Sequence, residues 1–537
     1  MKNKYNPICP IVSISFFLFS ILLTAQEIEW QQVLGGVHSE YLYDVKATPD
    51  YGFLLIGSSF SEDSGNKAGK GQGDLDYFLW KMDESGKMEW QKTFGGSGSD
   101  YLYSASLTQE GGYILGGSSD SPKSGDKQED GFGNMDFWIL KLDPTGEEEW
   151  EITLGGIGND QLQSIQQTPD GGFIIGGSSD SSPIKDPEGK IIGNKSGESK
   201  GSLDYWLIKL SASGEVEWEE TFGGIFSDQL KTVLITEEGY LVGGTSNSII
   251  SGNKSAKELG MNDYWIIKLD ADGNQQWQRA YGGEGDESLA QIIPTENGYL
   301  LAGSSNSKTS ENKKSDSVNG TDFWVIEIDK QGEVNWDNTY DTGQWDMLVN
   351  VTKSGDNTFL LGGYASTETL GKRTDNKGIN DFVAIKINRR GEMLWSKIIG
   401  GNGTDQLKGL TQTRDGGYIL AGNSDSKKSD DKDKASIGGN DYWVVKLGNE
   451  KKQPEERQLV EIYPNPTYQY TNIIISEEFK EAEVQVFNLN GQKLQQNRLP
   501  YRSTPIDLQG YPPGVYIFKI TVDGVTEDVK VIKKGSN

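Results

Sequence analysis

The sequence predicts an all-β protein in which one structural unit is repeated seven times. An aspartate followed by two large apolar residues recurs at steps of 60, 68, 59, 59, 59 and 60 residues. The seven copies are Asp76-Tyr77-Phe78, Asp136-Phe137-Trp138, Asp204-Tyr205-Trp206, Asp263-Tyr264-Trp265, Asp322-Phe323-Trp324, Asp381-Phe382-Val383 and Asp441-Tyr442-Trp443. A fixed period of this length marks an array of one supersecondary unit. The composition agrees, because 69 glycines and 34% apolar residues suit short strands joined by many turns.

The sequence pattern of each unit predicts four strands, and the second unit shows this pattern well. Residues 149–154 alternate in polarity, residues 161–168 form a second strand, and residues 173–177 are nearly all apolar, as in a strand covered on both faces. The fourth strand is the one that begins at Asp204. Four strands in each of seven units predict a seven-bladed β-propeller.

The two ends of the repeat array predict that the ring of blades is closed. The last repeat stops after Leu447 without its partner strand, and the chain begins with an orphan copy of that partner at residues 27–36. We therefore expect the N-terminal strand to complete the seventh blade, which removes two exposed sheet edges. The layout, with Gly-Gly after the second strand and a tryptophan on the fourth, resembles kelch-type propellers, although the period is longer and the motifs differ.

The ends of the chain also predict its domain organisation. Lys2, Lys4, the apolar residues 11–23 and Ala25 have the order of a signal peptide over residues 1–25. The propeller is expected over 26–447, a charged linker over 448–458 and a small C-terminal β-sandwich over 459–537. No other stretch approaches the roughly 20 apolar residues that span a bilayer, so no transmembrane segment is expected in the mature protein.

Composition argues against several function classes. A net charge of −28 repels nucleic acid phosphates and anionic membranes. The only cysteine, Cys9, lies in the predicted signal peptide, and the only histidine is His38. Disulfides, thiolate chemistry, zinc sites and serine-histidine-aspartate triads are therefore not expected.

An acidic residue recurs four positions after the second residue of each Gly-Gly pair. We expect these acids around the mouth of the central channel, where their main role is to tie loops by accepting backbone N–H groups. The alternatives are a cation site, with calcium as the candidate ion, or carboxylates for glycoside chemistry. No other cofactor is predicted. The ring comprises Glu40, Asp100, Asp160, Asp228, Glu287, Asp346 and Asp405.

Departures from the repeat are the better candidates for a ligand site. In the sixth unit Asp341-Thr342 replaces Gly-Gly, and Trp345 stands where other units have small residues. Phe226 is expected at the matching place in the fourth unit, with His38 nearby in the first. Aromatic residues beside polar loops are able to stack on sugar rings. The apolar residues of the long third loop, Ile184, Ile191 and Ile192, and the valine at position 383 are further departures.

The last 75 or so residues break the repeat and carry a different set of motifs. The residues that define them are Tyr463, Pro464, Asn465, Pro466, Gly491, Gly514, Tyr516, Lys530 and Lys533. This region resembles the type A C-terminal sorting domain of Bacteroidota type IX secretion cargo. The resemblance implies export through the periplasm and then across the outer membrane, with the secretion machinery as partner and the cell surface or medium as destination.

These observations favour a non-catalytic extracellular protein that binds a glycan or a surface protein. The alternatives are a carbohydrate-active enzyme and a purely structural surface protein. An enzyme needs one unrepeated acid pair, whereas the acids of this sequence repeat in every unit, so no catalytic residue is predicted.

Overall fold

The computed structural model describes residues 26–535 except 319, 356, 367–377 and 450–457. The predicted signal peptide and most of the predicted linker lie outside the described residues. Within the described ranges every regular element is a β-strand, and no helix that could cross a membrane is present.

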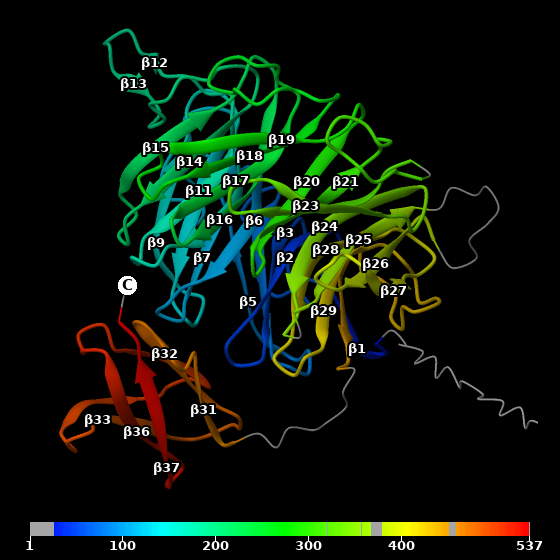
Figure 1. Cartoon of the computed structure of the whole chain (residues 1–537). Coiled ribbons are helices and arrows are strands. Elements are labelled where there is room, and N and C mark those ends of the chain that lie inside the picture. Colours follow the sequence, from blue (N-terminus) through cyan, green and yellow to red (C-terminus); the bar gives the residue numbers. More distant parts are fainter. Residues whose placement is uncertain (1–25, 319, 356, 367–377, 450–457, 536–537) are drawn as a thin grey trace, which may run out of the picture.

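The repeat array forms seven four-stranded antiparallel sheets, one for each predicted unit (Figure 1). The first three are β2 (Glu40–Ala47), β3 (Phe53–Ser59), β4 (Asp76–Met82) and β5 (Met88–Phe94); β6 (Asp100–Leu107), β7 (Tyr113–Ser119), β8 (Asp136–Leu142) and β9 (Glu148–Leu154); and β10 (Asp160–Gln167), β11 (Phe173–Ser179), β14 (Asp204–Leu210) and β15 (Val216–Phe222). A short hairpin, β12 (Ile184–Lys185) and β13 (Ile191–Ile192), extends from the third sheet.

The remaining four sheets repeat this order. They are β16 (Asp228–Thr236), β17 (Gly239–Ser246), β18 (Asp263–Leu269) and β19 (Gln275–Tyr281); β20 (Glu287–Pro294), β21 (Gly298–Ser305), β22 (Asp322–Asp329) and β23 (Val334–Tyr340); β24 (Trp345–Lys353), β25 (Phe359–Ser366), β26 (Asn380–Ile387) and β27 (Met393–Ile399); and β28 (Asp405–Gln412), β29 (Tyr418–Ser424), β30 (Asp441–Leu447) and β1 (Ile28–Leu34).

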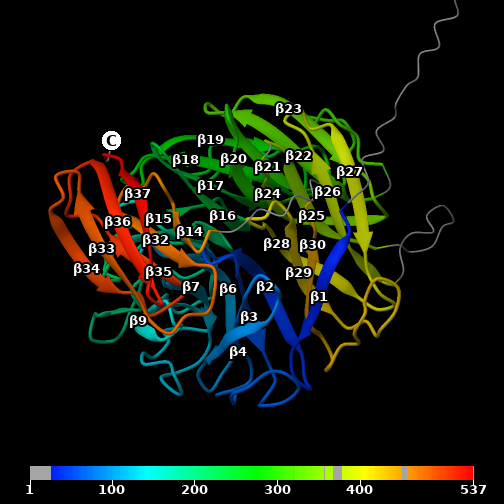
Figure 2. The same ribbon diagram turned by 90° about the horizontal axis from the view of Figure 1, so that it is seen from below.

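The predicted pairing of the N-terminal strand with the last repeat is confirmed. β1 pairs antiparallel with β30, from Ile28 opposite Leu447 to Leu34 opposite Tyr442. The first strands of successive sheets contact one another in the order β2, β6, β10, β16, β20, β24 and β28, and β28 contacts β2. In Figure 2 the colours accordingly pass around the body from blue through green to yellow, and blue β1 lies among the yellow strands.

The core lies between neighbouring sheets, and the repeated motif supplies much of it. The ring of Tyr77 lies 4.7 Å from that of Trp138 in the next sheet, and its hydroxyl donates to the Trp138 carbonyl at 2.9 Å. The Tyr442 hydroxyl of the last sheet donates to the Phe78 carbonyl of the first sheet at 3.4 Å. The same kind of hydrogen bond therefore joins the sheets at the two ends of the repeat array. Val383, the valine that departs from the repeated motif, is fully buried in this core. It therefore packs against its neighbours and does not form a surface site.

The C-terminal module has seven strands in two sheets around one apolar core. The sheets contain β31 (Val460–Tyr463), β32 (Tyr470–Ile475) and β35 (Ser503–Asp507), and β34 (Lys493–Arg498), β33 (Ala482–Asn488), β36 (Gly514–Val522) and β37 (Val525–Lys533). This agrees with the predicted small β-sandwich, although the sequence of β34 and β35 has no clear strand pattern.

The body has two different faces. Short turns such as Thr48–Gly52 and Asp83–Gly86 lie on one face, and the long loops and the links between sheets lie on the other. The C-terminal module contacts the short-turn face, where Glu461 pairs with Arg414 and Arg502 with Glu84. These contacts place the module on the short-turn face.

Candidate functional site

The recurrent acids lie at the junctions between sheets, where the link from one sheet enters the next. Each accepts a backbone N–H from the second residue of its link, for example Gly96 N to Asp100 Oδ2 at 2.7 Å and Gly401 N to Asp405 Oδ2 at 2.7 Å. This is the loop-tying bond that the sequence predicts. All seven acids are fully buried, so their carboxylates are closed off from solvent, and their expected place around the mouth of the central channel stays a prediction.

A second acid, the aspartate of each repeated motif, lies at the same junction. Asp76 Oδ2 accepts the Gln72 N–H at 2.9 Å and so ties the long loop of its own sheet. Its Oδ1 approaches the first glycine of the link so closely that a Cβ at Gly95 would lie 1.7 Å away. Burial raises the pKa of Asp76 to about 7, against the hydrogen bond from Gln72, and the nearby Asp100 charge adds to the rise.

A third recurrent element of the junction was readable in the sequence and was missed. A Ser-x-Asn/Asp-Lys tetrapeptide, such as Ser64 to Lys67, occurs in the long loops. Asn66 Oδ1 accepts the Gly35 N–H and its Nδ2 donates to the Val33 carbonyl, both across the junction. Lys67 is buried with its Nζ 5.5 Å from the Phe78 ring centroid. In the long loops that the structure describes, the Asn or Asp of this element holds the loop on the link beneath it.

The sixth junction differs from the other six in its chemistry. Asp341 stands in place of the first glycine, and one carboxylate oxygen each of Asp322, Asp341 and Asp346 lie within 4.8 Å of one another. Thr342 donates its N–H and its hydroxyl to Asp346. Burial, with the charges of its two acidic neighbours, raises the pKa of Asp346 to about 7, and burial with the charge of Asp341 raises that of Asp322 to about 6.

The predicted ligand candidate Trp345 lies beside a polar hollow on the long-loop face. Trp345 is 53% exposed and, with Met347, forms one wall of a cavity of about 380 Å³. The rest of the lining comes from the ends of the fourth and fifth sheets and is mostly amide and hydroxyl groups: Ser227, Gln229, Thr245, Asn247, Asn262, Asp286, Glu287, Ser288, Ser304, Asn306 and Thr321.

The other two candidates are placed differently from the prediction. The bridges Leu203–Ser227 and Thr321–Trp345 show that Trp345 corresponds to Ser227, so Phe226 lies one residue before the matching place. Phe226 and His38 correspond to each other, because each donates its N–H to the equivalent loop serine. Phe226 is exposed next to the hollow, whereas His38 lies at the junction of the seventh and first sheets.

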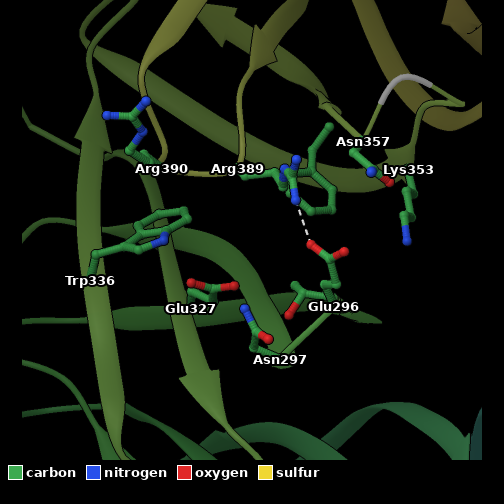
Figure 3. Close-up of a pocket in the computed structure, with 10 residues that line it drawn as sticks. Glu296, Asn297, Glu327, Trp336, Lys353, Asn357, Arg389 and Arg390 are labelled. Carbon is green, nitrogen blue, oxygen red and sulfur yellow. Dashed lines mark hydrogen bonds and ion pairs between the residues drawn. The ribbon is translucent and has the colours of Figure 1, made fainter.

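A second cavity, of about 410 Å³, opens on the short-turn face between the fifth and sixth sheets (Figure 3). Glu327 and Trp336 line it together with Arg389, which is paired with Glu296. Glu327 replaces the buried lysine found at this strand position in sheets such as the first, where Lys81 pairs with Asp50. No sequence prediction pointed to this cavity.

The apolar residues by which the long third loop departs from the repeat form an exposed hairpin. Ile184 pairs with Ile192 across β12 and β13, and Ile184, Ile191 and Ile192 are 43%, 41% and 37% exposed. Figure 1 shows the hairpin at the end of the molecule opposite the C-terminal module.

The C-terminal motif residues hold their module together. Asn465 donates to the Lys530 carbonyl and accepts the Ile532 N–H, which ties the Tyr-Pro-Asn-Pro segment to β37. Lys533 is 8% exposed and donates to the carbonyls of Leu508, Gln509 and Tyr511. Its place is therefore inside the module and not on a solvated strand edge.

Comparison with known proteins identifies the C-terminal module but does not assign the seven-sheet body to a family. Residues 461–534 match the secretion system C-terminal sorting domain. A segment of 166 residues, 30% of the chain, is 24% identical to the regulatory protein FlaEY of Caulobacter vibrioides and spans 17% of that protein.

Solved structures resemble the chain only distantly. BBS1N in complex with ARL6DN gives a TM-score of 0.40 at 8% identity, over 80% of this chain and 99% of that one. The extracellular domain of a putative hybrid two-component system from B. thetaiotaomicron gives 0.28 at 13% identity, over 93% and 69%. With TM-scores below 0.5, these likenesses assign neither a fold family nor a function. The sorting domain does fix the destination: the chain is a type IX secreted protein of the outer surface or the extracellular space.

Proposed function

We propose that the seven sheets are the blades of a closed β-propeller that works outside the cell as a non-catalytic binding protein. The cyclic contacts of the first strands and the pairing of β1 with β30 support closure. The kelch-like layout of the sequence is consistent with this architecture and remains a prediction.

The exposed Trp345 beside the polar hollow carries the binding proposal. Its indole offers an apolar face at the rim of a cavity of 380 Å³. Asn247 and Asn306 use their Oδ1 atoms to accept backbone N–H groups of Ser227 and Asp286, each at 2.8 Å. Their amide Nδ2 groups have no partner within the described part of the chain and are available to ligand hydroxyls. An aromatic face with several amide donors is the chemistry that recognises a sugar ring.

Charge narrows the ligand class to neutral sugars. Among the described residues that line the hollow, none is lysine or arginine, and Asp286 and Glu287 add negative charge. The chain as a whole carries −28. Uronic or sulfated glycans are therefore disfavoured, and we expect a neutral oligosaccharide.

The buried junction acids support a non-catalytic role. Glycoside chemistry needs two carboxyl groups that reach the substrate, whereas Asp100, Asp160 and their equivalents are buried and bonded to link N–H groups and loop serines. Their recurrence in seven copies is the pattern of a structural device.

A glycan array probed with the purified secreted protein tests the proposal. We expect binding to neutral oligosaccharides, and Trp345→Ala should lower the affinity by about tenfold or more, because an aromatic contact in a small site carries much of the binding energy.

Ile250→Ala is a matched control, since Ile250 is 58% exposed in a long loop but does not line the hollow. Binding only to acidic glycans, or equal binding by wild type and Trp345→Ala, would show that the hollow is not the site.

A further inference from the structure

The first strand of each of the seven sheets contains a β-bulge at the same place. Its pairing with the second strand skips one residue, which lies three positions after the buried junction acid. Bulges redirect side chains and are frequent next to functional sites. The seven skipped residues are Tyr43, Tyr103, Gln163, Lys231, Ala290, Val349 and Lys408.

The skipped side chains meet inside the ring of first strands, which lie toward the middle of the body in Figure 2. The rings of Tyr43 and Tyr103, from neighbouring sheets, have centroids 4.8 Å apart. Lys231 donates its Nζ to Gln163 Oε1 of the next sheet at 3.1 Å. Burial lowers the pKa of Lys408, and the charge of Lys231 lowers it further, although their sheets, the seventh and the fourth, are not neighbours in the ring. The two lysines therefore face each other across the space that the first strands enclose. This space is the central channel of the propeller proposed above, and the placement rests on that proposal.

The positive charges of these two lysines are not balanced by a carboxylate. Burial lowers the pKa of Lys231, and among the described residues no acid offsets the effect there or at Lys408. The buried junction lysines differ, because carboxylates lie near them: Asp228 and Asp263 act on Lys254 against the effect of burial. Like charges that are desolvated without a counter-charge are unfavourable in a protein interior. This place therefore favours an anion from solution.

The side chains beside the lysines offer further hydrogen-bond donors. Lys408 Nζ lies 5.6 Å from the ring centroid of Tyr364, which stands where the second strands of the other sheets have serine, threonine or asparagine. Within the described part of the chain, the hydroxyls of Tyr43, Tyr103 and Tyr364 and the Nε2 group of Gln163 form no hydrogen bond. Burial raises the pKa values of the three phenols, so they remain protonated donors. Ammonium, hydroxyl and amide donors together are the chemistry that binds an oxyanion.

We propose that Lys231 and Lys408 bind a small oxyanion, a phosphate or carboxylate group, in the central channel. Asp44, the acid that follows the bulge of the first sheet, is already paired with Lys46 at 2.6 Å. The net charge of −28 disfavours large polyanions, which limits the ligand to a small anion. The site is separate from the hollow, whose lining has no lysine or arginine among the described residues, but Gln229 of that lining lies only two residues before Lys231 on β16.

Isothermal titration calorimetry tests the site in the full secreted protein. Inorganic phosphate and acetate are titrated separately into protein dialysed free of both anions, at about 0.15 M sodium chloride, which screens exposed charges beyond about 8 Å. We expect saturable binding of one anion per protein. Binding of phosphate indicates a phosphate-bearing ligand, and binding of acetate alone indicates a carboxylate. Binding of neither anion overturns the site.

Lys231→Gln and Lys408→Gln each remove one positive charge and should each weaken anion binding by about tenfold or more. Without the anion, each variant should melt at or above the wild-type temperature, because an unbalanced charge is gone, so lost binding does not reflect unfolding. Lys190→Gln is the matched control and should bind as the wild type does, since Lys190 is exposed in the β12–β13 hairpin. Equal binding by the wild type and both channel variants overturns the anion site. A protein that binds the anion but no glycan contradicts the hollow alone, and one that binds glycan but no anion contradicts this site alone.

Discussion

Arg414 of the body and Glu461 of the C-terminal module form an ion pair, with 2.8 Å between Nη2 and Oε2. The guanidinium also lies 4.0 Å from the ring centroid of Tyr51 and 4.8 Å from that of Tyr463. Tyr51 donates its hydroxyl to Glu461, so the contact joins turns of the first and seventh sheets to the sorting domain. The module is therefore held on the face opposite the proposed binding hollow.

Replacing Arg414 should loosen the module without unfolding the body. Arg414→Ala removes a largely buried ion pair and two cation–π contacts, which together are worth on the order of 1–2 kcal/mol. We expect faster hydrogen exchange of the amides of residues 48–52, whose turn loses its cover, and an unchanged melting temperature of the body.

Arg389→Ala is the control for this experiment, because Arg389 lies in a turn of the same face but pairs with Glu296 of the body. If both variants leave exchange at residues 48–52 unchanged, the Arg414 contact does not hold the module.

Gly155→Ala should destabilise the body by about 2 kcal/mol or more, since overpacking at a buried site forces its neighbours to move. A Cβ at Gly155 would lie 1.9 Å from Asp136 Oδ1 and 2.8 Å from Asp160 Oδ2. Chemical denaturation measures the effect. Gly355→Ala is the control, since a Cβ there meets nothing within 4 Å. Equal midpoints for the two variants would contradict the tight approach of the acids.

The sequence was informative about the fold because the repeat imposes the same local pattern in every sheet. The strand boundaries and the pairing of residues 28–34 with the last repeat both follow from that pattern. β34 and β35 escaped prediction for a physical reason: residues 493–498 have no alternating apolar face, and residues 503–507 contain Pro505. Both strands lie at sheet edges, where a neighbouring strand supplies the pairing.

The candidate site was predicted only in outline. Trp345 and Asp341 were visible as departures from the repeat, because a repeat makes a single substitution conspicuous. The burial of Asp100 and its equivalents was not visible, since periodicity does not show how a long loop folds over a link. The hollow itself is formed by segments about one repeat apart, and only the packing of three sheets brings Asn247, Asn306 and Trp345 together.

Acidification from pH 7.5 to 5 should stabilise the body. Burial raises the pKa of Asp76 to about 7 and those of Asp136 and Asp263 to about 6, above the values of about 4 expected when unfolded. Groups of this kind contribute stability that is present below the unfolded pKa and is lost as the pH rises through the folded pKa. We expect a gain on the order of 1 kcal/mol for each such group, measured as a higher melting temperature at pH 5.

Asp76→Asn should flatten part of this pH dependence, because the amide does not titrate. Asp83→Asn serves as the comparison. Hydrogen bonds from Ser85 and Lys87 outweigh desolvation and lower the pKa of Asp83. The contribution of Asp83 to stability therefore changes below this pH range. A melting temperature that rises from pH 5 to 7.5 would show that the junction acids are not the dominant titrating groups.

The Tyr442 hydroxyl provides a test of whether the seventh sheet is joined to the first. Tyr442 donates to the Phe78 carbonyl at 3.4 Å, and Tyr77 donates to the Trp138 carbonyl at 2.9 Å within the array. Both hydroxyls are buried, so Tyr442→Phe and Tyr77→Phe should each cost about 1 kcal/mol, and less at Tyr442 because its bond is longer. If the first and last sheets meet as the others do, both variants unfold in one transition by chemical denaturation. A separate early transition in Tyr442→Phe alone would show that the seventh sheet is not locked to the first.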